Sequence, residues 1–319
     1  MDFLKRFFIY CILLFLIISA FILSIDPYDK YGINVFGFKH KAVMQSRDYK
    51  FQMLETSDID YKGFILGSSA AHRFHTEDIK EILKVDVFNY SVQHTTTDDY
   101  KAQVNHLLER YNPKFIILNI DFTALDESFD TDNRLYNSSL KKYLFNQKTE
   151  THYFDSDYLS LRAIADSFNV IGVNLWGKVT HKYLENGNYI NEINKTNRVN
   201  LKQSSYPHYK ISKKRVSDLL GIKKRLTERN IDIYVLISPL SIEHLRKILD
   251  NPNLSKIHNQ FKQELSSIFP NVWDFENLGI SDYSTPQYFI DSTHPTRSLF
   301  KVISKKIFDH SSTNLGTRL

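Results

Sequence analysis

The amino-acid sequence predicts an α/β protein with a doubly wound, mostly parallel sheet, preceded by one N-terminal transmembrane helix. Three features support this fold class. Short apolar runs alternate with amphipathic helical patterns five times along the chain. Several of these runs are continuously apolar, which is typical of parallel strands covered on both faces. A separate, longer apolar run lies close to the N-terminus.

The N-terminal run covers residues 7–25, nineteen residues without a charge, which is about the length that crosses a hydrocarbon core. Residues 1–6 include Lys5 and Arg6, and acidic residues follow the run. By the positive-inside tendency, the short N-terminus stays in the cytoplasm and everything after the run lies outside it. A cleaved signal peptide is the alternative, but no small-x-small cleavage pattern follows. We therefore predict a single-pass signal anchor with an extracytoplasmic C-terminal domain.

The composition is that of a folded protein of ordinary charge. Of the 319 residues, 42% are hydrophobic and 24% are charged, which suffices for a large core and argues against disorder. The net charge of +5 comes from lysines interleaved with acids, so the sequence predicts no nucleic-acid partner. Cys11, the single cysteine, lies inside the anchor and excludes an internal disulfide and a cysteine-based metal site. No histidine spacing indicates a metal, and no cofactor motif is present.

Residues 26–59 are predicted to be an exit segment, residues 60–310 an α/β domain, and residues 311–319 a tail. In the first half of the domain, apolar runs give strands and amphipathic stretches give helices. The clearest is the run Phe115–Ile120, whose continuous apolar character predicts a strand buried on both faces. The predicted elements are a strand at 62–66, a helix at 76–83, a strand at 85–89, a helix at 100–111 and a strand at 114–121.

The pattern degrades over residues 122–210, which are rich in Tyr, Asn and His and contain one helical stretch at 158–170. We interpret this part as a cap inserted over the edge of the sheet. Regular alternation then resumes. The predicted elements are a helix at 212–229, a strand at 231–237, a helix at 255–269, a strand at 272–275 and a final helix at 298–308.

A glycine and two serines, Gly67, Ser68 and Ser69, end the first predicted strand. This pattern predicts a strand running into a tight turn, with a helix beginning just after it. Such a turn presents a side chain at the carboxyl edge of the sheet, next to helix amides that stabilise negative charge. Serines are also ordinary turn and cap residues, so the tripeptide alone does not predict a nucleophile.

A second motif, Asp291-Ser292-Thr293-His294, follows an aromatic and apolar run near the C-terminus. A nucleophilic serine needs a base to take its proton, and the base needs a carboxylate that fixes its tautomer. Asp291 and His294 supply both partners within one short segment. We therefore predict that Ser69, His294 and Asp291 form a catalytic triad.

The two motifs together resemble the SGNH (GDSL-type) hydrolases, whose first block is Gly-Asp-Ser or a variant and whose last block is Asp-x-x-His. The resemblance covers roughly residues 60–310 and implies a flavodoxin-like fold with Ser69, not Ser68, as nucleophile. The Gly-Ser-Ser variant and the anchor are most similar to a subgroup that includes the D-alanyl transfer proteins of teichoic acid operons and the acetylation proteins of alginate export. That subgroup implies a separate multi-spanning membrane protein that delivers acyl groups.

The same resemblance implies an oxyanion hole made by the N–H of Ser69, a backbone N–H after the second strand and an asparagine after the third. Ser91 takes the second position, where the family has glycine. At the third position the chain reads Asn119-Ile120-Asp121, where the family has Gly-x-Asn-Asp. Aligned from the end of the strand, Asp121 takes the asparagine place, where an ionised carboxylate would oppose the developing oxyanion. Either Asn119 fills the role, or Asp121 has another task, such as pairing with a cation or supporting the sheet edge, or the hole differs.

Two further features suggest substrate contacts. Arg73 follows the nucleophile by four residues and could hold an anionic group, although a structural ion pair explains it equally well. Aromatic residues of the insertion, among them Trp176 and Tyr153, offer stacking surfaces for sugar rings, or simply the packing of a small cap.

From these features we expect a serine acyltransferase or esterase acting on acyl esters of cell-surface polysaccharide. The alternative is a membrane-anchored scaffold with little chemistry, which binds polysaccharide or assembles an export complex. The departures at Ser91 and Asp121 favour the scaffold, and the intact Ser, Asp and His favour the enzyme.

Overall fold

The computed structural model describes residues 2–27, 31, 33, 35–38, 46–129, 160–176, 182–190, 206, 208–276, 288–309 and 316–319. By its internal contacts the chain divides into two compact units. The first unit comprises Met1–Met44 and Lys148–Lys182, and the second comprises Gln45–Gln147 and Tyr183–Leu319.

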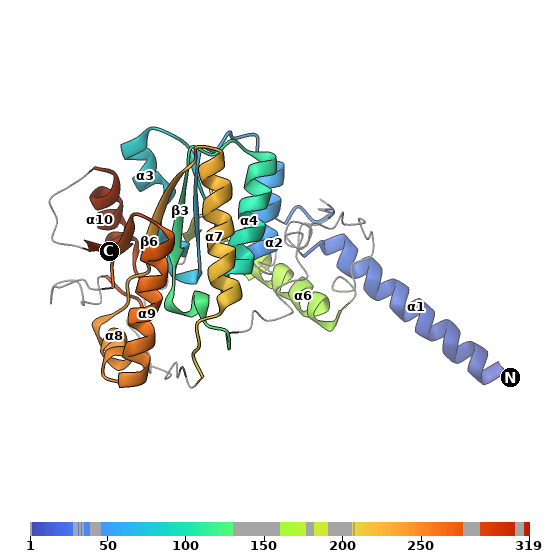
Figure 1. Cartoon of the computed structure of the whole chain (residues 1–319). Helices are drawn as coiled ribbons and strands as arrows, with labels where there is room; N and C mark the ends of the chain where they lie inside the picture. The colour runs from blue at the N-terminus through green and yellow to red at the C-terminus, as the bar shows by residue number, and fades with distance from the viewer. Residues whose placement is uncertain are drawn as a thin grey trace. The chain divides into compact units, whose positions relative to one another are not determined.

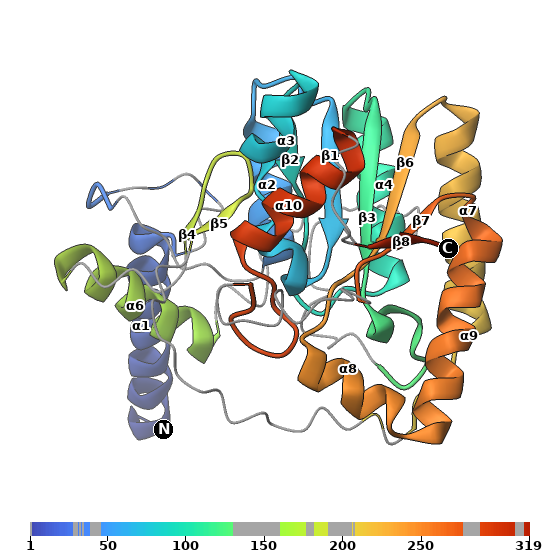
Figure 2. The same ribbon diagram turned by 90° about the vertical axis from the view of Figure 1, so that its left-hand side faces the viewer.

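A six-stranded sheet in the order β2-β1-β3-β6-β7-β8 forms the centre of the second unit (Figure 2). The first five of these strands are mutually parallel, and β8 joins the edge antiparallel to β7. Counted along the chain, the parallel strands have the order 2-1-3-4-5, which is the flavodoxin-like doubly wound arrangement. The predicted fold class is therefore confirmed. The strands are β1 (Gly63–Gly67), β2 (Val87–Asn89), β3 (Phe115–Ile120), β6 (Asp232–Ile237), β7 (Val272–Asp274) and β8 (Thr317–Arg318).

Helices cover both faces of this sheet (Figures 1 and 2). One face packs against α2, α4, α7 and α9, and the other against α3 and α10. All six residues of β3 are buried, with Ile116 and Leu118 on the first face and Ile117 on the second, so its continuous apolar run follows from burial on both sides. The helices are α2 (Ser46–Thr56), α3 (Thr76–Leu83), α4 (Thr97–Arg110), α7 (Lys213–Glu228), α8 (Ile242–Leu249), α9 (Pro252–Ile268) and α10 (Arg297–Phe308).

The structure contains elements that the sequence did not predict, among them α2, α8 and β8. The exit segment at 26–59 contains α2, which packs Phe51 and Leu54 into the core of the second unit. The C-terminal tail contains β8, and α8 precedes α9. Arg47 and Lys50 are fully buried on α2 and mask its helical periodicity, whereas β8 is a two-residue strand that exists only through pairing with β7.

The predicted insertion at 122–210 is divided between the two units. Its described parts are the 3-10 helix η2 (Phe122–Leu125), the helix α6 (Leu161–Trp176) and the hairpin of β4 (Lys182–Tyr183) and β5 (Tyr189–Ile190). Residues 130–159, including Tyr153, lie outside the described residues.

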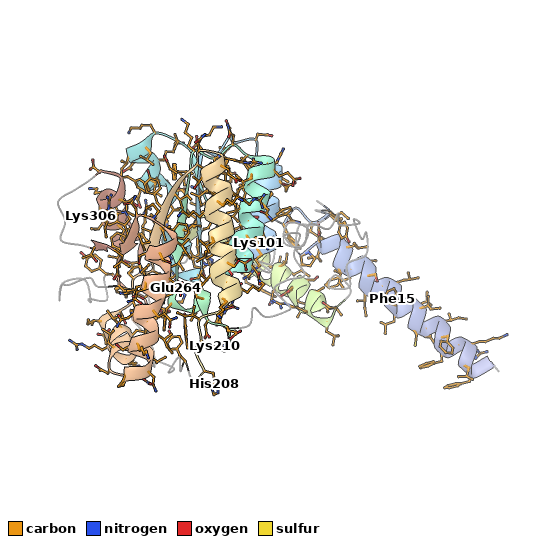
Figure 3. All side chains as sticks on the ribbon, viewed as in Figure 1. Phe15, Lys101, His208, Lys210, Glu264 and Lys306 are labelled. Carbon is orange, nitrogen blue, oxygen red and sulfur yellow. The ribbon has the colours of Figure 1, made fainter. Side chains whose placement is uncertain are left out.

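The first unit is built on the helix α1 (Asp2–Ile25). Within the described chain, α1 is the helix long and apolar enough to cross a membrane, with a candidate span of 23 residues from Phe3 to Ile25. Its apolar side chains point outward along most of its length, as Figure 3 shows for Phe15, which is 53% exposed. Large apolar side chains exposed in this way are costly in water and favourable in lipid. A single membrane anchor therefore fits this helix.

The direction of insertion stays a prediction with a direct test. Because Lys5 and Arg6 precede the span, we expect a reporter fused after Leu319 to be active only outside the cytoplasm, with the protein retained in the membrane fraction. Protease protection and fractionation measure both properties. Recovery of soluble protein beginning near residue 26 would instead show a cleaved signal, and an active cytoplasmic reporter would reverse the topology.

Candidate active site

The turn after β1 presents Ser69 at the carboxyl edge of the sheet. Ser68 is the N-cap of the 3-10 helix η1 (Ser69–Arg73), and its Oγ accepts a hydrogen bond of 3.1 Å from the N–H of Ala70. The hydroxyl of Ser68 thus caps η1, and it also lies close to the carboxyl of Asp121. The helix that follows the turn has only five residues.

Gly67 is required by the packing under this turn. A Cβ atom at this position would lie 2.7 Å from the Cβ of Ala71 and 3.2 Å from the Cβ of Asn119. Any larger residue would push η1 away from β3, because the first of these contacts is shorter than real Cβ contacts. The glycine therefore fixes how closely Ser69 approaches the end of β3.

The structure brings Ser69, His294 and Asp291 together. Ser69 Oγ lies 2.9 Å from His294 Nε2, and His294 Nδ1 lies 2.7 Å from Asp291 Oδ2 and 2.8 Å from Oδ1. With the Asp291 carboxylate against Nδ1, that nitrogen carries the proton and Nε2 is left to accept one from Ser69. The two motifs, 225 residues apart in the chain, meet at hydrogen-bonding distance.

A closed loop before α10 holds Asp291 and His294 in this relation. The backbone N–H groups of Thr293 and His294 each donate to Asp291 Oδ1 at 2.9 Å. The N–H of Ile290 donates to the carbonyl of His294 at 3.0 Å, and the N–H of Ser241 donates to the carbonyl of Ser292 at 3.0 Å. The Asp-x-x-His spacing thus lets one carboxylate accept from its own loop and from the imidazole.

Asp291 is suited to stay ionised beside the base. Partial burial acts to raise its pKa, but the hydrogen bonds from His294 and from the backbone of Thr293 outweigh burial and lower the pKa to about 2. The carboxylate is therefore charged throughout the neutral range and stabilises a positive charge on His294 when the imidazole takes a proton.

Comparison with known proteins finds distant likenesses only. No family model matches the chain, and no curated protein matches it. Among solved structures, the chain is similar to a GDSL-like lipase from Bacteroides thetaiotaomicron VPI-5482, with 8% identity, 83% of this chain and 97% of that chain covered, and a TM-score of 0.41. It is also similar to the psychrotrophic esterase EstA from Pseudoalteromonas sp., in a structure inhibited by monoethylphosphonate, with 12% identity, coverage of 78% and 95%, and a TM-score of 0.36. Similarity at this level says nothing about substrate or reaction.

Ser91 and Asn119, the oxyanion-hole residues predicted at the second and third strands, are fully buried, unlike Ser69. The N–H of Ser91 donates to Asn89 Oδ1 at 3.0 Å, and Ser91 is fully buried. Asn119 lies inside β3, fully buried, and neither polar atom of its side chain has a hydrogen-bond partner among the described residues. Ser69, as the first residue of η1, has a backbone N–H without an intrahelical acceptor.

A buried lysine, Lys50, contacts both Asn89 and Ser91. Lys50 Nζ lies 3.3 Å from Asn89 Oδ1 and 3.5 Å from Ser91 Oγ, and 4.9 Å from the centre of the Tyr183 ring. Complete burial lowers the pKa of Lys50 well below its usual range. Sequence reasoning missed this residue because α2 was not predicted, and its role here is to hold the Asn89–Ser91 turn in place.

Asp121 follows β3 directly and faces the same edge as the triad. Its Oδ1 is buried and has no hydrogen-bond partner among the described residues. Burial raises the pKa of Asp121, the hydroxyls of Ser68 and Ser238 and the nearby His294 offset part of the rise, and repulsion from Glu276 adds to it. The described residues show no ion pair between Asp121 and Arg73, whose guanidinium lies 5.2 Å from the centre of the Tyr189 ring.

Ser238 was missed as a member of this group. Its hydroxyl is buried close to the carboxyl of Asp121 and offsets part of the rise in the pKa of that carboxyl. The sequence contains the signal, since Ser238 ends the strand β6, and β6 pairs in parallel with β3. Carboxyl ends of neighbouring parallel strands meet at one edge, so the residues after β3 and β6 come together.

Proposed function

We propose that this chain is a membrane-anchored serine acyltransferase or esterase, acting outside the cytoplasm on acyl esters of a cell-surface polysaccharide. The observation that carries the proposal is the hydrogen-bonded series Ser69–His294–Asp291 at the carboxyl edge of a doubly wound sheet. These are the three residue types that nucleophilic acyl transfer needs, and they stand in the required order. Ser69 Oγ lies 2.9 Å from His294 Nε2, and His294 Nδ1 lies 2.7 Å from Asp291 Oδ2.

In the proposed reaction, Ser69 Oγ attacks the ester carbonyl while its proton moves to His294 Nε2. Asp291 stabilises the imidazolium that results. The tetrahedral intermediate then expels the alcohol, which takes the proton from His294, and the acyl group remains on Ser69. Water or a sugar hydroxyl gives its proton to His294 and attacks the acyl-serine, which regenerates the enzyme.

Polysaccharide as the substrate and transfer as the outcome are supported by the anchor and by the Gly-Ser-Ser form of the first motif. A helix that spans the membrane next to the catalytic unit in the chain suits a reaction partner in the same membrane. A separate multi-spanning membrane protein would then supply the acyl groups, and the polysaccharide would be the acceptor.

A fluorophosphonate probe tests the proposed chemistry. We expect it to label the purified full-length protein at Ser69, because the probe phosphonylates a serine that is activated by a neighbouring base. Mass spectrometry of the tryptic peptide locates the adduct. Absence of labelling in folded protein would favour the catalytically weak scaffold. Two observations agree with a scaffold: the N–H of Ser91 is already hydrogen-bonded, and Asn119 is buried.

We further propose that Asp121 donates a hydrogen bond from its protonated carboxyl to the oxygen of the reacting carbonyl. The buried carboxyl lies close to the hydroxyls of Ser68 and Ser238 and to His294, and the described residues show no ion pair between it and a lysine or arginine. Burial raises the pKa of this carboxyl and so favours its protonated form, which can donate a hydrogen bond. The titratable groups that interact with it are His294, Glu276 and, from α4, Tyr100.

The variant Asp121→Asn distinguishes a protonated Asp121 that donates a hydrogen bond from an ionised Asp121 that opposes the charge of the oxyanion. The wild-type kcat/KM on an acetyl ester should fall as pH rises and Asp121 loses its proton, whereas the variant, whose amide donates at every pH, should lack this fall. Asp121→Leu, which removes the donor, should lose about 100-fold at pH values where the wild-type carboxyl is protonated, and the gap should narrow as pH rises.

Stability provides the second measurement on Asp121. Since burial raises its pKa above the unfolded value, the folded state holds the proton more strongly, and stability falls as pH rises between the two values. Asp121→Asn removes this fall, so its thermal midpoint above neutral pH should equal or exceed that of the wild type. An alkaline fall in kcat/KM that persists in Asp121→Asn, or a lower thermal midpoint, would overturn the donor role.

A further inference from the structure

The helix α6 of the first unit exposes a continuous apolar stripe. Leu161, Phe168 and Leu175 are 87%, 61% and 64% exposed. They are spaced by seven residues, so successive members are rotated by only about 20° around the helix and lie in one line. Trp176, 75% exposed, closes the stripe at the C-terminal end of the helix. Four large apolar side chains are thus mostly exposed on this side of α6.

The opposite side of α6 is already packed. Ala163, Ser167 and Val170 are buried, and the hydroxyl of Ser167 donates to the carbonyl of Ala163 at 2.7 Å. The polar pair Arg162 and Asp166, 3.6 Å apart, lies between the two faces. A surface helix of a soluble protein needs one apolar face, and α6 has two. An exposed apolar patch bordered by polar residues marks a surface that binds a protein or a membrane.

The position of α6 along α1 indicates the membrane. Ala163 and Ile164 pack against Ile18, Phe21 and Ile22 of α1. The rings of Phe21 and Phe168 are 5.2 Å apart. In Figure 2, α6 crosses α1 near the end of α1 that is far from the N-terminus.

The contacts also give the depth of α6. Ile22 and Ile18 precede the end of α1 at Ile25 by three and seven residues. At about 1.5 Å per residue, these contacts lie about 5 and 10 Å below the end of the helix. Interfacial amphipathic helices bury their apolar face about 5–10 Å deep, at the boundary between headgroups and acyl chains. The stripe of α6 therefore lies at the level where such a helix contacts lipid.

We propose that α6 is an interfacial helix whose stripe of Leu161, Phe168, Leu175 and Trp176 is embedded in the lipid leaflet around the C-terminal end of α1. Lipid is the occupant because the stripe continues the exposed apolar surface of the spanning helix: Phe168 touches Phe21, and Leu23 nearby on α1 is exposed. The inference rests on the proposed anchor and is independent of the chemistry at Ser69. The chain would thus be held by a crossing helix and by a second helix lying in the interface.

The two tryptophans of the chain make this measurable. Trp176 belongs to the stripe, and Trp273 is 7% exposed in β7. Full-length Trp273→Phe protein, reconstituted in phosphatidylcholine vesicles with brominated acyl chains, reports on Trp176 alone. We expect strong quenching by the brominated lipid, emission shifted to the blue, and little quenching by aqueous iodide. The matched variant Trp176→Phe reports on Trp273, whose emission the brominated lipid should leave unchanged.

A third variant tests the stripe itself. With Leu161, Phe168 and Leu175 changed to serine in the Trp273→Phe background, quenching by brominated lipid should fall and quenching by iodide should rise, while α1 keeps the protein in the vesicles. The inference is overturned if Trp176 is quenched by iodide and not by brominated lipid in vesicle-bound protein, or if it is shielded from both, which would mean a protein covers it. Failure of the protein to stay in vesicles would refute the anchor instead, and a loss of fluorophosphonate labelling would concern the catalytic proposal alone.

Discussion

Replacing Ser69 by alanine is expected to abolish fluorophosphonate labelling and to lower kcat/KM on an acetyl ester by at least about 10⁴-fold. The reason is that, in the proposed reaction, Ser69 Oγ forms the acyl bond, and His294 Nε2, 2.9 Å away, has no other nucleophile to activate among the described residues. What remains would come from ester binding and carbonyl polarisation. Initial rates with the purified full-length protein, together with mass spectrometry of the labelled peptide, measure both effects.

The matched control is Ser68→Ala. Ser68 is chemically identical and adjacent, but its Oγ caps η1 by accepting from the N–H of Ala70. Loss of a cap costs about 1 kcal/mol of stability and should leave much of the labelling and turnover in place. If Ser68→Ala were inactive and Ser69→Ala active, the nucleophile would be Ser68.

The second large effect is expected at His294 and Asp291. His294→Ala removes the base and should be about as damaging as Ser69→Ala. Asp291→Asn should lower kcat by about 10⁴-fold, because an amide next to Nδ1 can leave its proton on the wrong nitrogen. Since the members of a triad act together, the double variant Ser69→Ala, His294→Ala should be no worse than either single one. A full set of single and double variants assayed on one ester gives the comparison.

Thr293→Ala is the control within the same loop. The Thr293 N–H that donates to Asp291 is retained, and two long contacts of its hydroxyl are lost, one of 3.3 Å to Asp291 Oδ1 and one of 3.4 Å to His294 Nδ1. We expect activity within a few-fold of the wild type. Normal labelling in His294→Ala, or activity losses that multiply in the double variant, would show that the two residues work separately.

Several of these features could be predicted from the sequence because their causes are local in the chain. The continuous apolar run Phe115–Ile120 predicted a strand buried on both faces, and the order of strands and helices predicted the doubly wound sheet. Gly67 at a strand end and the three-residue spacing of Asp291 and His294 likewise identified the segments that the structure brings together. The long apolar helix at the N-terminus was recognisable from nineteen uncharged residues alone.

Other features depend on partners far away in the sequence, and only the tertiary structure decided them. The surroundings of Asp121 come from Ser68, Ser238 and Glu276, three strand ends that meet only in the folded sheet, so its raised pKa and missing cation could not be foreseen. The sequence predicted that the N–H of Ser91 is free to stabilise an oxyanion. In the fold this N–H donates to Asn89 Oδ1, which also accepts from the buried Lys50. Sequence patterns report which face of an element is apolar, whereas burial, hydrogen-bond partners and charge environment are set by the elements that pack against it.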